Sequence, residues 1–152
     1  MAKLYAKSQA KLHLMKMAAG ISSLEELKNR QSRYAKKRKK NGASYLEVGH
    51  VTRMWPKRAE ELLDGGCLYW VFAGGIRVRQ RILDFQEYAD EDGHRRCRIV
   101  LDSELTETDF LKKRAFQGWR YLAVGDAPPD IGKASTQGPS ELRAQLKELG
   151  LL

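Results

Sequence analysis

The chain has 152 residues, of which 42% are hydrophobic and 31% charged, so it is long enough to bury the core of one globular domain. Its 28 Lys and Arg against 19 Asp and Glu give a net charge of +9, which favours polyanionic partners. No apolar run approaches the roughly 20 residues that span a bilayer. Lysines 3, 7, 11 and 16 interrupt the apolar stretch that a secretory signal needs, so we expect a cytoplasmic protein without a membrane segment.

The first elements are a strand and a helix. Residues 11–17 mix apolar and polar side chains over the length of a strand. Ser22 and Glu25 have the spacing of a capping box, and apolar residues three and four apart follow them. We therefore expect a helix over residues 22–40, ended by Asn41-Gly42.

The C-terminal half of this expected helix carries most of the excess charge. Residues 28–40 contain eight basic side chains and no acid, and without these eight the net charge would be +1. Cations at a helix C-terminus suit the helix dipole, so the run is either a solvated helix end or a polyanion-binding segment. The basic residues are Lys28, Arg30, Arg33, Lys36, Lys37, Arg38, Lys39 and Lys40.

A second strand, a short helix and a β-hairpin are expected next. Residues 48–54 have the pattern of a strand, and Pro56 suits the first position of a helix that runs to Asp64 and ends at Gly65-Gly66. Residues 67–73 and 76–88 are the most strand-like part of the chain, and Gly74-Gly75 between them predicts a tight turn.

Arginines alternate with apolar residues in two of the later strands. Alternation along residues 76–82 places three arginines on one face of the sheet, and residues 95–101 repeat the pattern. If these strands pair, acidic neighbours such as Asp84 and Glu87, or a bound anion, must offset the repulsion. The arginines are Arg77, Arg79 and Arg81 in the first strand and Arg96 and Arg98 in the second.

The rest of the chain predicts one more strand, a linker and a helix. Residues 115–122 form the strand, with a bulge or close contact at Gly118. Residues 125–139 are rich in Pro, Gly, Asp and Ala, and Ser140 caps a leucine-striped helix to residue 152. We therefore expect one α+β domain over residues 1–124, a linker over 125–139 and a C-terminal helix over 140–152.

The motifs of common catalytic and metal sites are not found in the sequence. Cys67 and Cys97 lack the spacing of zinc ligands, and we expect both to be reduced thiols within strands. No P-loop, serine-nucleophile elbow or paired-histidine motif occurs, so we expect neither a cofactor nor a metal.

Two segments place basic residues beside indole rings. Arg53, Trp55, Lys57 and Arg58 form the first, and Trp119-Arg120 the second. An indole can stack on an unpaired base while Arg and Lys neutralise phosphates. The indoles could equally be core residues covered by arginines.

Long segments of the sequence resemble a bacterial family of unknown function. They include residues 50–58 (His-Val-Thr-Arg-Met-Trp-Pro-Lys-Arg), 61–66, 69–71, 79–83, 100–102 and 116–122 (Phe-Gln-Gly-Trp-Arg-Tyr-Leu), and the resemblance covers residues 11–130. More distantly, the order of strand, short helix ending Leu-Leu-Asp-Gly-Gly, and strands with Trp and Arg resembles PUA-like domains such as the ASCH and EVE domains.

The PUA-like resemblance implies a small mixed or antiparallel β-barrel, to which the basic helix and the C-terminal helix would be additions. Many such domains bind RNA or modified bases in a cleft between the short helix and the barrel. One wall of that cleft would carry Arg53, Trp55, Lys57 and Arg58, and the other Arg79, Trp119 and Arg120. Some ASCH-like proteins are hydrolases or nucleases, so an enzyme is the alternative that the resemblance implies.

The sequence leads to the hypothesis of a nucleic-acid-binding domain, with RNA favoured over DNA. The expected binding residues are Lys36, Lys37, Arg38, Lys39, Lys40, Arg53, Trp55, Lys57, Arg58, Arg77, Arg79, Arg81, Trp119 and Arg120. A hydrolase of RNA, nucleotides or modified bases would use Asp102, Lys57 or His50 as acid/base groups. A third hypothesis is an assembly factor whose basic helix docks an acidic partner such as a ribosomal complex.

Overall fold

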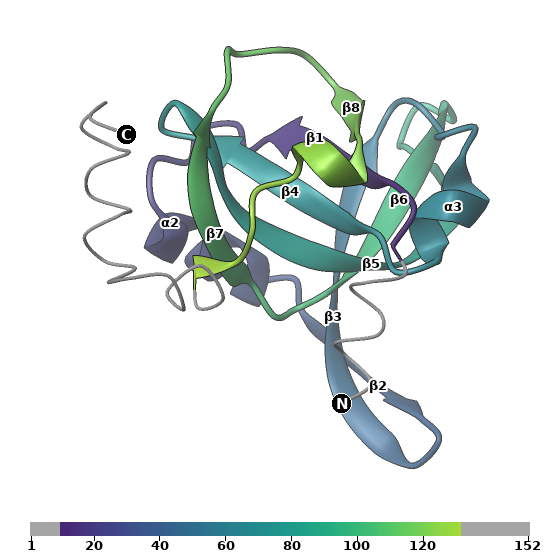
Figure 1. Cartoon of the computed structure of the whole chain (residues 1–152). Coiled ribbons are helices and arrows are strands. Elements are labelled where there is room, and N and C mark those ends of the chain that lie inside the picture. The colour runs from purple at the N-terminus through teal and green to yellow at the C-terminus, as the bar shows by residue number, and fades with distance from the viewer. Residues whose placement is uncertain (1–9, 132–152) are drawn as a thin grey trace.

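The computed structural model describes residues 10–131 and shows a mixed α+β fold built mostly from strands (Figure 1). Its helices are α2 (Leu24–Ser32) and α3 (Ala59–Leu63), with a 3-10 turn η1 (Val124–Asp126). Its strands are β1 (His13–Met17), β2 (Lys36–Lys40), β3 (Ala43–Thr52), β4 (Cys67–Phe72), β5 (Gly75–Ala89), β6 (Arg95–Asp102), β7 (Thr106–Lys112) and β8 (Trp119–Leu122). Among these residues no helix has both the length and the apolar character to cross a membrane. The expected C-terminal helix lies outside the described residues.

The strands form one sheet in the order β2-β3-β6-β5-β4-β1-β8, with β7 beside β5. The long strand β5 organises it: its first half pairs with β4 on one edge and β7 on the other, and its second half pairs with β6. A bulge between Ile82 and Asp84 separates the two halves. Bulges bend a strand and increase its twist, so the sheet curves strongly along β5.

The sheet is open, so the expected closed barrel is wrong. Over residues 43–47 the outer edge of β3 pairs with β2, but within the described chain no strand pairs with that edge at residues 48–52. Side chains bridge the gap instead: the Trp119 indole N–H donates to the Met54 carbonyl at 2.9 Å, and the His50 and Trp70 rings meet edge to face at 5.0 Å. We call this gap, between β3 and the edge formed by β8 and the end of β1, the seam.

The predicted basic helix over residues 22–40 is also wrong in its second half. The helix ends at Ser32, and the five cations of residues 36–40 form β2, which pairs with β3 as a projecting hairpin arm (Figure 1). Adjacent cations repel at helical i,i+4 spacing, whereas a strand directs them alternately to opposite faces. Asn41 (φ 53°) and Gly42 (φ 80°) supply the two left-handed residues that a tight hairpin turn requires.

The helix starts differ slightly from the expected ones. The capping box lies one residue later than predicted: Ser23 accepts from the backbone N–H of Glu26, and the Glu26 carboxylate accepts from Ser22. Helix α3 begins at Ala59 rather than Pro56, because Arg58 has non-helical dihedral angles and its N–H donates to the Tyr121 hydroxyl at 3.1 Å.

The predicted β4–β5 hairpin and the alternation along β5 are confirmed. All six residues of β4 are buried, and the turn uses Ala73 (φ 49°) and Gly74 (φ 94°), one residue earlier than the predicted Gly74-Gly75. In β5, residues 77, 79 and 81 are partly exposed between buried neighbours. The reduced thiols Cys67 and Cys97 are buried in β4 and β6, as predicted.

Apolar side chains form two clusters on the two faces of the curved sheet. The larger includes Leu14, Leu62 and Leu101, and Leu27 of α2 packs into it. The smaller, on the other face, is built around Tyr69, Val71 and Ile76 of β4 and β5. The described end of the chain also packs on the sheet: the Asp109 N–H donates to the Pro129 carbonyl at 2.8 Å.

Candidate nucleic-acid interface

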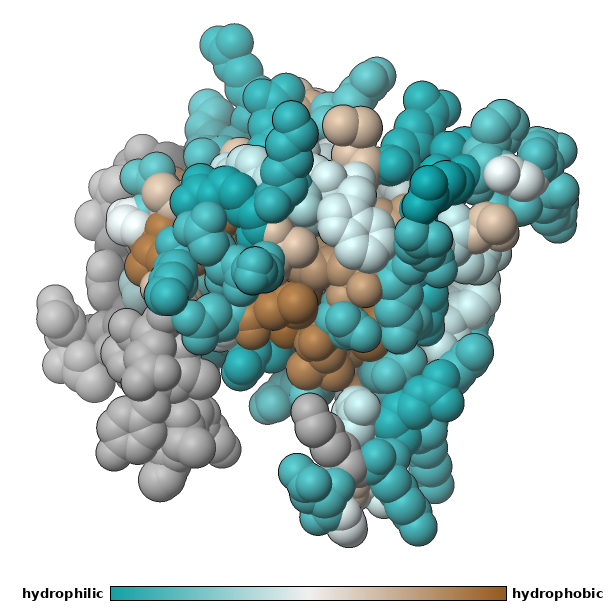
Figure 2. All heavy atoms as spheres, turned by 90° about the vertical axis from the view of Figure 1, so that its right-hand side faces the viewer, coloured by the Kyte–Doolittle hydropathy of each residue, from teal (hydrophilic) through white to brown (hydrophobic). Residues whose placement is uncertain are grey.

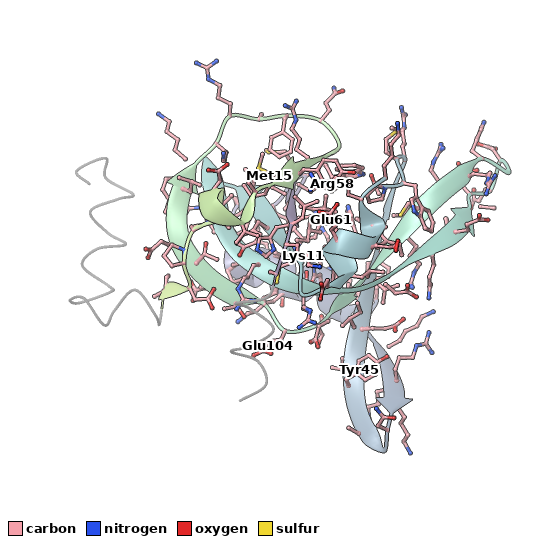
Figure 3. All side chains as sticks on the ribbon, turned by 45° about the vertical axis from the view of Figure 1, so that its right-hand side comes forward. Lys11, Met15, Tyr45, Arg58, Glu61 and Glu104 are labelled. Carbon is pink, nitrogen blue, oxygen red and sulfur yellow. The ribbon has the colours of Figure 1, made fainter. Side chains whose placement is uncertain are left out.

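The most strongly charged feature is the arm formed by residues 36–47, which we call the basic hairpin. It holds five cations and a single acid, Glu47. The Glu47 carboxylate is buried and shared, lying 3.3 Å from Arg38 and 3.6 Å from Arg98. Tyr45 marks the arm in Figure 3, and the exposed side chains of Lys36, Lys37 and Lys39 have no carboxylate partner among the described residues.

Three neighbouring hollows follow the seam, and we call them together the seam groove. An inner hollow of about 200 Å³ lies between α2, β1 and β3. It shares Lys16 and Val51 with a middle hollow of about 430 Å³. The middle hollow in turn shares Arg53 and Arg96 with an outer hollow of about 220 Å³, which Trp55 also lines. The shared walls place the three side by side, with the outer hollow past the end of β3 and against residues of β5 and β6.

The charged side chains that line the inner and middle hollows are all cations. Lys16 and Arg30 line the inner hollow, and Lys16, Arg53 and Arg96 the middle one. Arg96 has a partial counterion in Asp90, 3.2 Å from its guanidinium. Burial lowers the pKa of the Lys16 ammonium, so this charge is held in a partly desolvated place where an anion would stabilise it.

His50 lies at the inner end of the groove. Its ring nitrogen Nε2 is buried without a hydrogen-bond partner in the described part of the chain. Burial, with smaller contributions from Lys16 and Arg30, lowers the pKa of His50 to about 4. The imidazole is therefore neutral near pH 7, with one N–H donor and one acceptor nitrogen.

The groove holds some of the residues predicted for an Arg/Trp cleft. Arg53 is exposed and lines two hollows, and Trp55 is 44% exposed with its ring 6.2 Å from that of Phe85. Trp119 is partly buried and positions the loop after β3 through its hydrogen bond to Met54.

Lys57 and Arg58 follow this loop at the start of α3. Lys57 is exposed, whereas Arg58 makes two hydrogen bonds to the Glu61 carboxylate, at 2.7 and 2.8 Å (Figure 3). The Arg58 guanidinium also lies 5.5 Å from the centre of the Tyr121 ring. These contacts make Arg58 a structural residue of this corner.

The remaining predicted arginines lie away from the seam groove. Arg77 donates to the carbonyls of Phe72 and Ala73, and Arg120 stacks over Phe116 at 5.2 Å. Arg79 makes two 2.7 Å hydrogen bonds to the Asp130 carboxylate, which hold its pKa above the usual range.

Arg79 and Arg81 line a separate cleft of about 480 Å³. Cys67 and Tyr69, which pair with these arginines across the β4–β5 ladder, belong to the smaller apolar cluster. This cleft therefore opens on the face of the sheet opposite to the larger cluster.

The comparisons with known proteins identify a family. The family described as "Protein of unknown function (DUF1489)" matches residues 14–152. The chain belongs to this family. No curated protein and no solved structure matches it. The description of DUF1489 names no activity, so only the geometry of the chain itself points to a function.

The acid/base residues considered for a hydrolase lie apart in this DUF1489 chain. Asp102 lines the cleft on the opposite face and accepts from the backbone N–H of Glu104, whereas His50 lines the seam groove and Lys57 lines neither. These residues do not form one catalytic group.

Asp90, Asp92 and His94 gather their ligand atoms within 4.8 Å of one another, at the β5–β6 turn. Hydrogen bonds of the turn account for this cluster, since one Asp90 oxygen accepts from the backbone N–H groups of Asp92 and His94. The other Asp90 oxygen pairs with Arg96.

Sequence reasoning missed Lys16 and Arg30 as residues of the groove. The alternation of the first strand could have placed Lys16 on the face of Leu14, but nothing in the sequence indicated that this face borders a seam. Arg30 was counted only as part of the basic run.

Proposed function

We propose that this protein binds nucleic acid, RNA in preference to DNA, with the basic hairpin as its electrostatic anchor and the seam groove as the channel for a single strand. One observation carries the proposal: five consecutive cations lie on an arm that projects from the sheet and offers one buried, shared carboxylate. Such charges repel one another, and a phosphate backbone relieves the repulsion while releasing its condensed counterions.

The groove supports binding of a single strand rather than a duplex. Its hollows of about 200 to 430 Å³ suit single nucleotides, and the cations Lys16, Arg53 and Arg96 each line two of them. The exposed indole of Trp55 offers a surface on which an unpaired base can stack, worth about 1–3 kcal/mol per base.

We also propose that the fold is an open relative of the PUA-like barrels, and the preference for RNA follows from this relation. The curvature of the sheet along β5 and the short helix α3, which connects β3 to β4, support it. This relation rests on similarity of the fold alone. The charge of the arm supports nucleic-acid binding independently of this relation.

The test compares two triple variants by fluorescence anisotropy with a short labelled RNA. Lys36→Gln, Lys37→Gln and Lys39→Gln together remove three cations from the arm. Lys112→Gln, Lys113→Gln and Arg114→Gln remove the same charge from the end of β7 and serve as the control. We expect the arm variant to lose at least tenfold in affinity and the control to lose little. Equal losses would show that only the net charge matters, and no binding by the wild type would remove the proposal.

The same arm could dock an acidic protein, and a capture experiment separates the two cases. Tagged protein is used to isolate partners from a lysate with and without nuclease treatment. We expect nuclease to release them, because nucleic acid bridges them to the arm. Partners that stay bound after nuclease, and that the arm variant loses, would favour an assembly factor instead.

A further inference from the structure

The inner hollow of the seam groove has features of a specific site rather than of a general basic surface. It is lined by apolar residues such as Leu27 and Val48, by the ring of Trp70 and by Tyr34, whose side chain is 64% exposed. Its volume of about 200 Å³ is below the roughly 300–1,000 Å³ of sites for drug-sized ligands. It therefore suits one small ring system.

A buried polar network fixes the walls of this hollow. The side-chain amides of Gln31 in α2 and Gln80 in β5 hydrogen-bond reciprocally, at 3.0 and 2.7 Å. The Trp70 indole N–H donates to the same Gln80 oxygen at 2.9 Å, and His50 packs edge to face on Trp70. Fully paired networks of this kind hold their members in one arrangement, so the hollow is preorganised.

Two unmet requirements point to the ligand. His50 presents a buried nitrogen with no hydrogen-bond partner in the described part of the chain, and an unsatisfied buried polar atom is costly. Lys16 and Arg30 line the same hollow, and no acidic side chain of the described residues lines it. A neutral imidazole suits the mixed donors and acceptors of a base edge, and the two cations suit a phosphate.

We propose that the inner hollow binds a single nucleotide, with the base between Tyr34 and the wall formed by Trp70, its edge on His50 Nε2, and its phosphate near Lys16 and Arg30. The nucleotide is either a free nucleoside monophosphate or one unit of a bound strand. The second case rests on the proposed function, and the first does not.

The test is isothermal titration calorimetry of the full chain with AMP, CMP, GMP and UMP, beside anisotropy with the short RNA. The variants are Lys16→Gln, His50→Phe and Tyr34→Ala; Tyr34 is exposed enough that its loss should leave the fold intact. The variant with Lys112, Lys113 and Arg114 replaced by Gln is the matched control. For the free-nucleotide case we expect at least one monophosphate to bind, each hollow variant to weaken it about tenfold, and the control to leave it unchanged.

The outcomes separate the two proposals. If no monophosphate binds but the hollow variants weaken RNA binding about tenfold, the site serves a nucleotide within the strand. If no monophosphate binds and all three variants bind RNA like the wild type, the hollow is not a nucleotide site, although the proposed function stands. If a monophosphate binds and RNA does not, the inner hollow is a nucleotide site and the proposed function is wrong.

Discussion

The buried imidazole of His50 makes the stability of the fold depend on pH in a defined range. In the folded chain the pKa of His50 is lowered from 6.5 to about 4, chiefly by burial and further by Lys16 and Arg30. As the pH falls, His50 is therefore protonated near pH 6.5 in the unfolded chain but only near pH 4 in the folded chain. The contribution of His50 to stability is therefore fully present above pH 6.5 and is lost as the pH falls toward 4.

The loss in the free energy of unfolding follows from the difference between the pKa values of His50 in the folded and unfolded chain. A difference of about 2.5 pKa units corresponds to about 3 kcal/mol once both states are protonated, and about 2 kcal/mol of it is lost between pH 7 and pH 5. That is a large share of the roughly 5–15 kcal/mol that stabilises a typical domain.

The assay is urea unfolding of the wild type and of His50→Leu at pH 7 and pH 5. Other groups that titrate in this range contribute alike to both proteins, so the difference between the two free energies of unfolding isolates His50. We expect the wild type to lose about 2 kcal/mol more than the variant on going from pH 7 to pH 5. A difference that stays constant between the two pH values would refute the account of His50 as a buried neutral group.

Two further predictions concern the frame around the site. Asp130→Asn leaves the partly buried Arg79 guanidinium without its counterion and should lower the free energy of unfolding by about 3 kcal/mol, whereas the double change Arg79→Met with Asp130→Leu should cost less. Equal losses in chemical unfolding would show that the charge itself is unimportant. Gly75→Ala would place a Cβ 2.3 Å from the Leu111 carbonyl oxygen, so we expect a fall of several degrees in Tm by calorimetry. Gly93→Ala, where nothing lies within 4 Å, should cost only the strain of its positive φ, and an equal effect at the two glycines would contradict the steric argument.

Part of this fold could be predicted from the sequence because its signals are local. Residues 67–72 are apolar throughout and are followed by Ala73 and two glycines, and a strand buried on both faces with a tight turn is the structure that fits such a segment. The alternation of arginines along β5 likewise needs only the period of a strand. Both predictions are confirmed without knowledge of the rest of the chain.

The basic run shows where local signals failed. Charge alone does not select helix or strand, and Asn41-Gly42 fits the end of a helix as well as a hairpin turn, for which Asn-Gly is the strongest signal. Residues 43–47, directly after it, supply the strand that pairs with β2. A turn signal followed by a strand pattern predicts a hairpin, and this combination would have placed residues 36–40 in a strand.

The candidate site could be predicted only where its residues are neighbours in sequence. Arg53 and Trp55 were found because they adjoin one another, and both line the groove. Lys16 and Arg30 line the groove because α2 lies beside the end of β1. Arg79 does not line it, because its guanidinium hydrogen-bonds to the carboxylate of Asp130, 51 residues further along the chain. Such long-range contacts depend on tertiary packing that no single segment reveals.

The central claim is that the basic hairpin contacts the phosphates of a nucleic-acid strand, and its most direct test is the salt dependence of RNA binding. The slope of log K against log salt concentration counts the phosphates that the protein neutralises, with about 0.7 per contact for a single strand. Replacing Lys36, Lys37 and Lys39 by Gln should therefore make the slope shallower by about 2, while the control at residues 112–114 keeps the wild-type slope. A wild-type slope in the arm variant would contradict the claim.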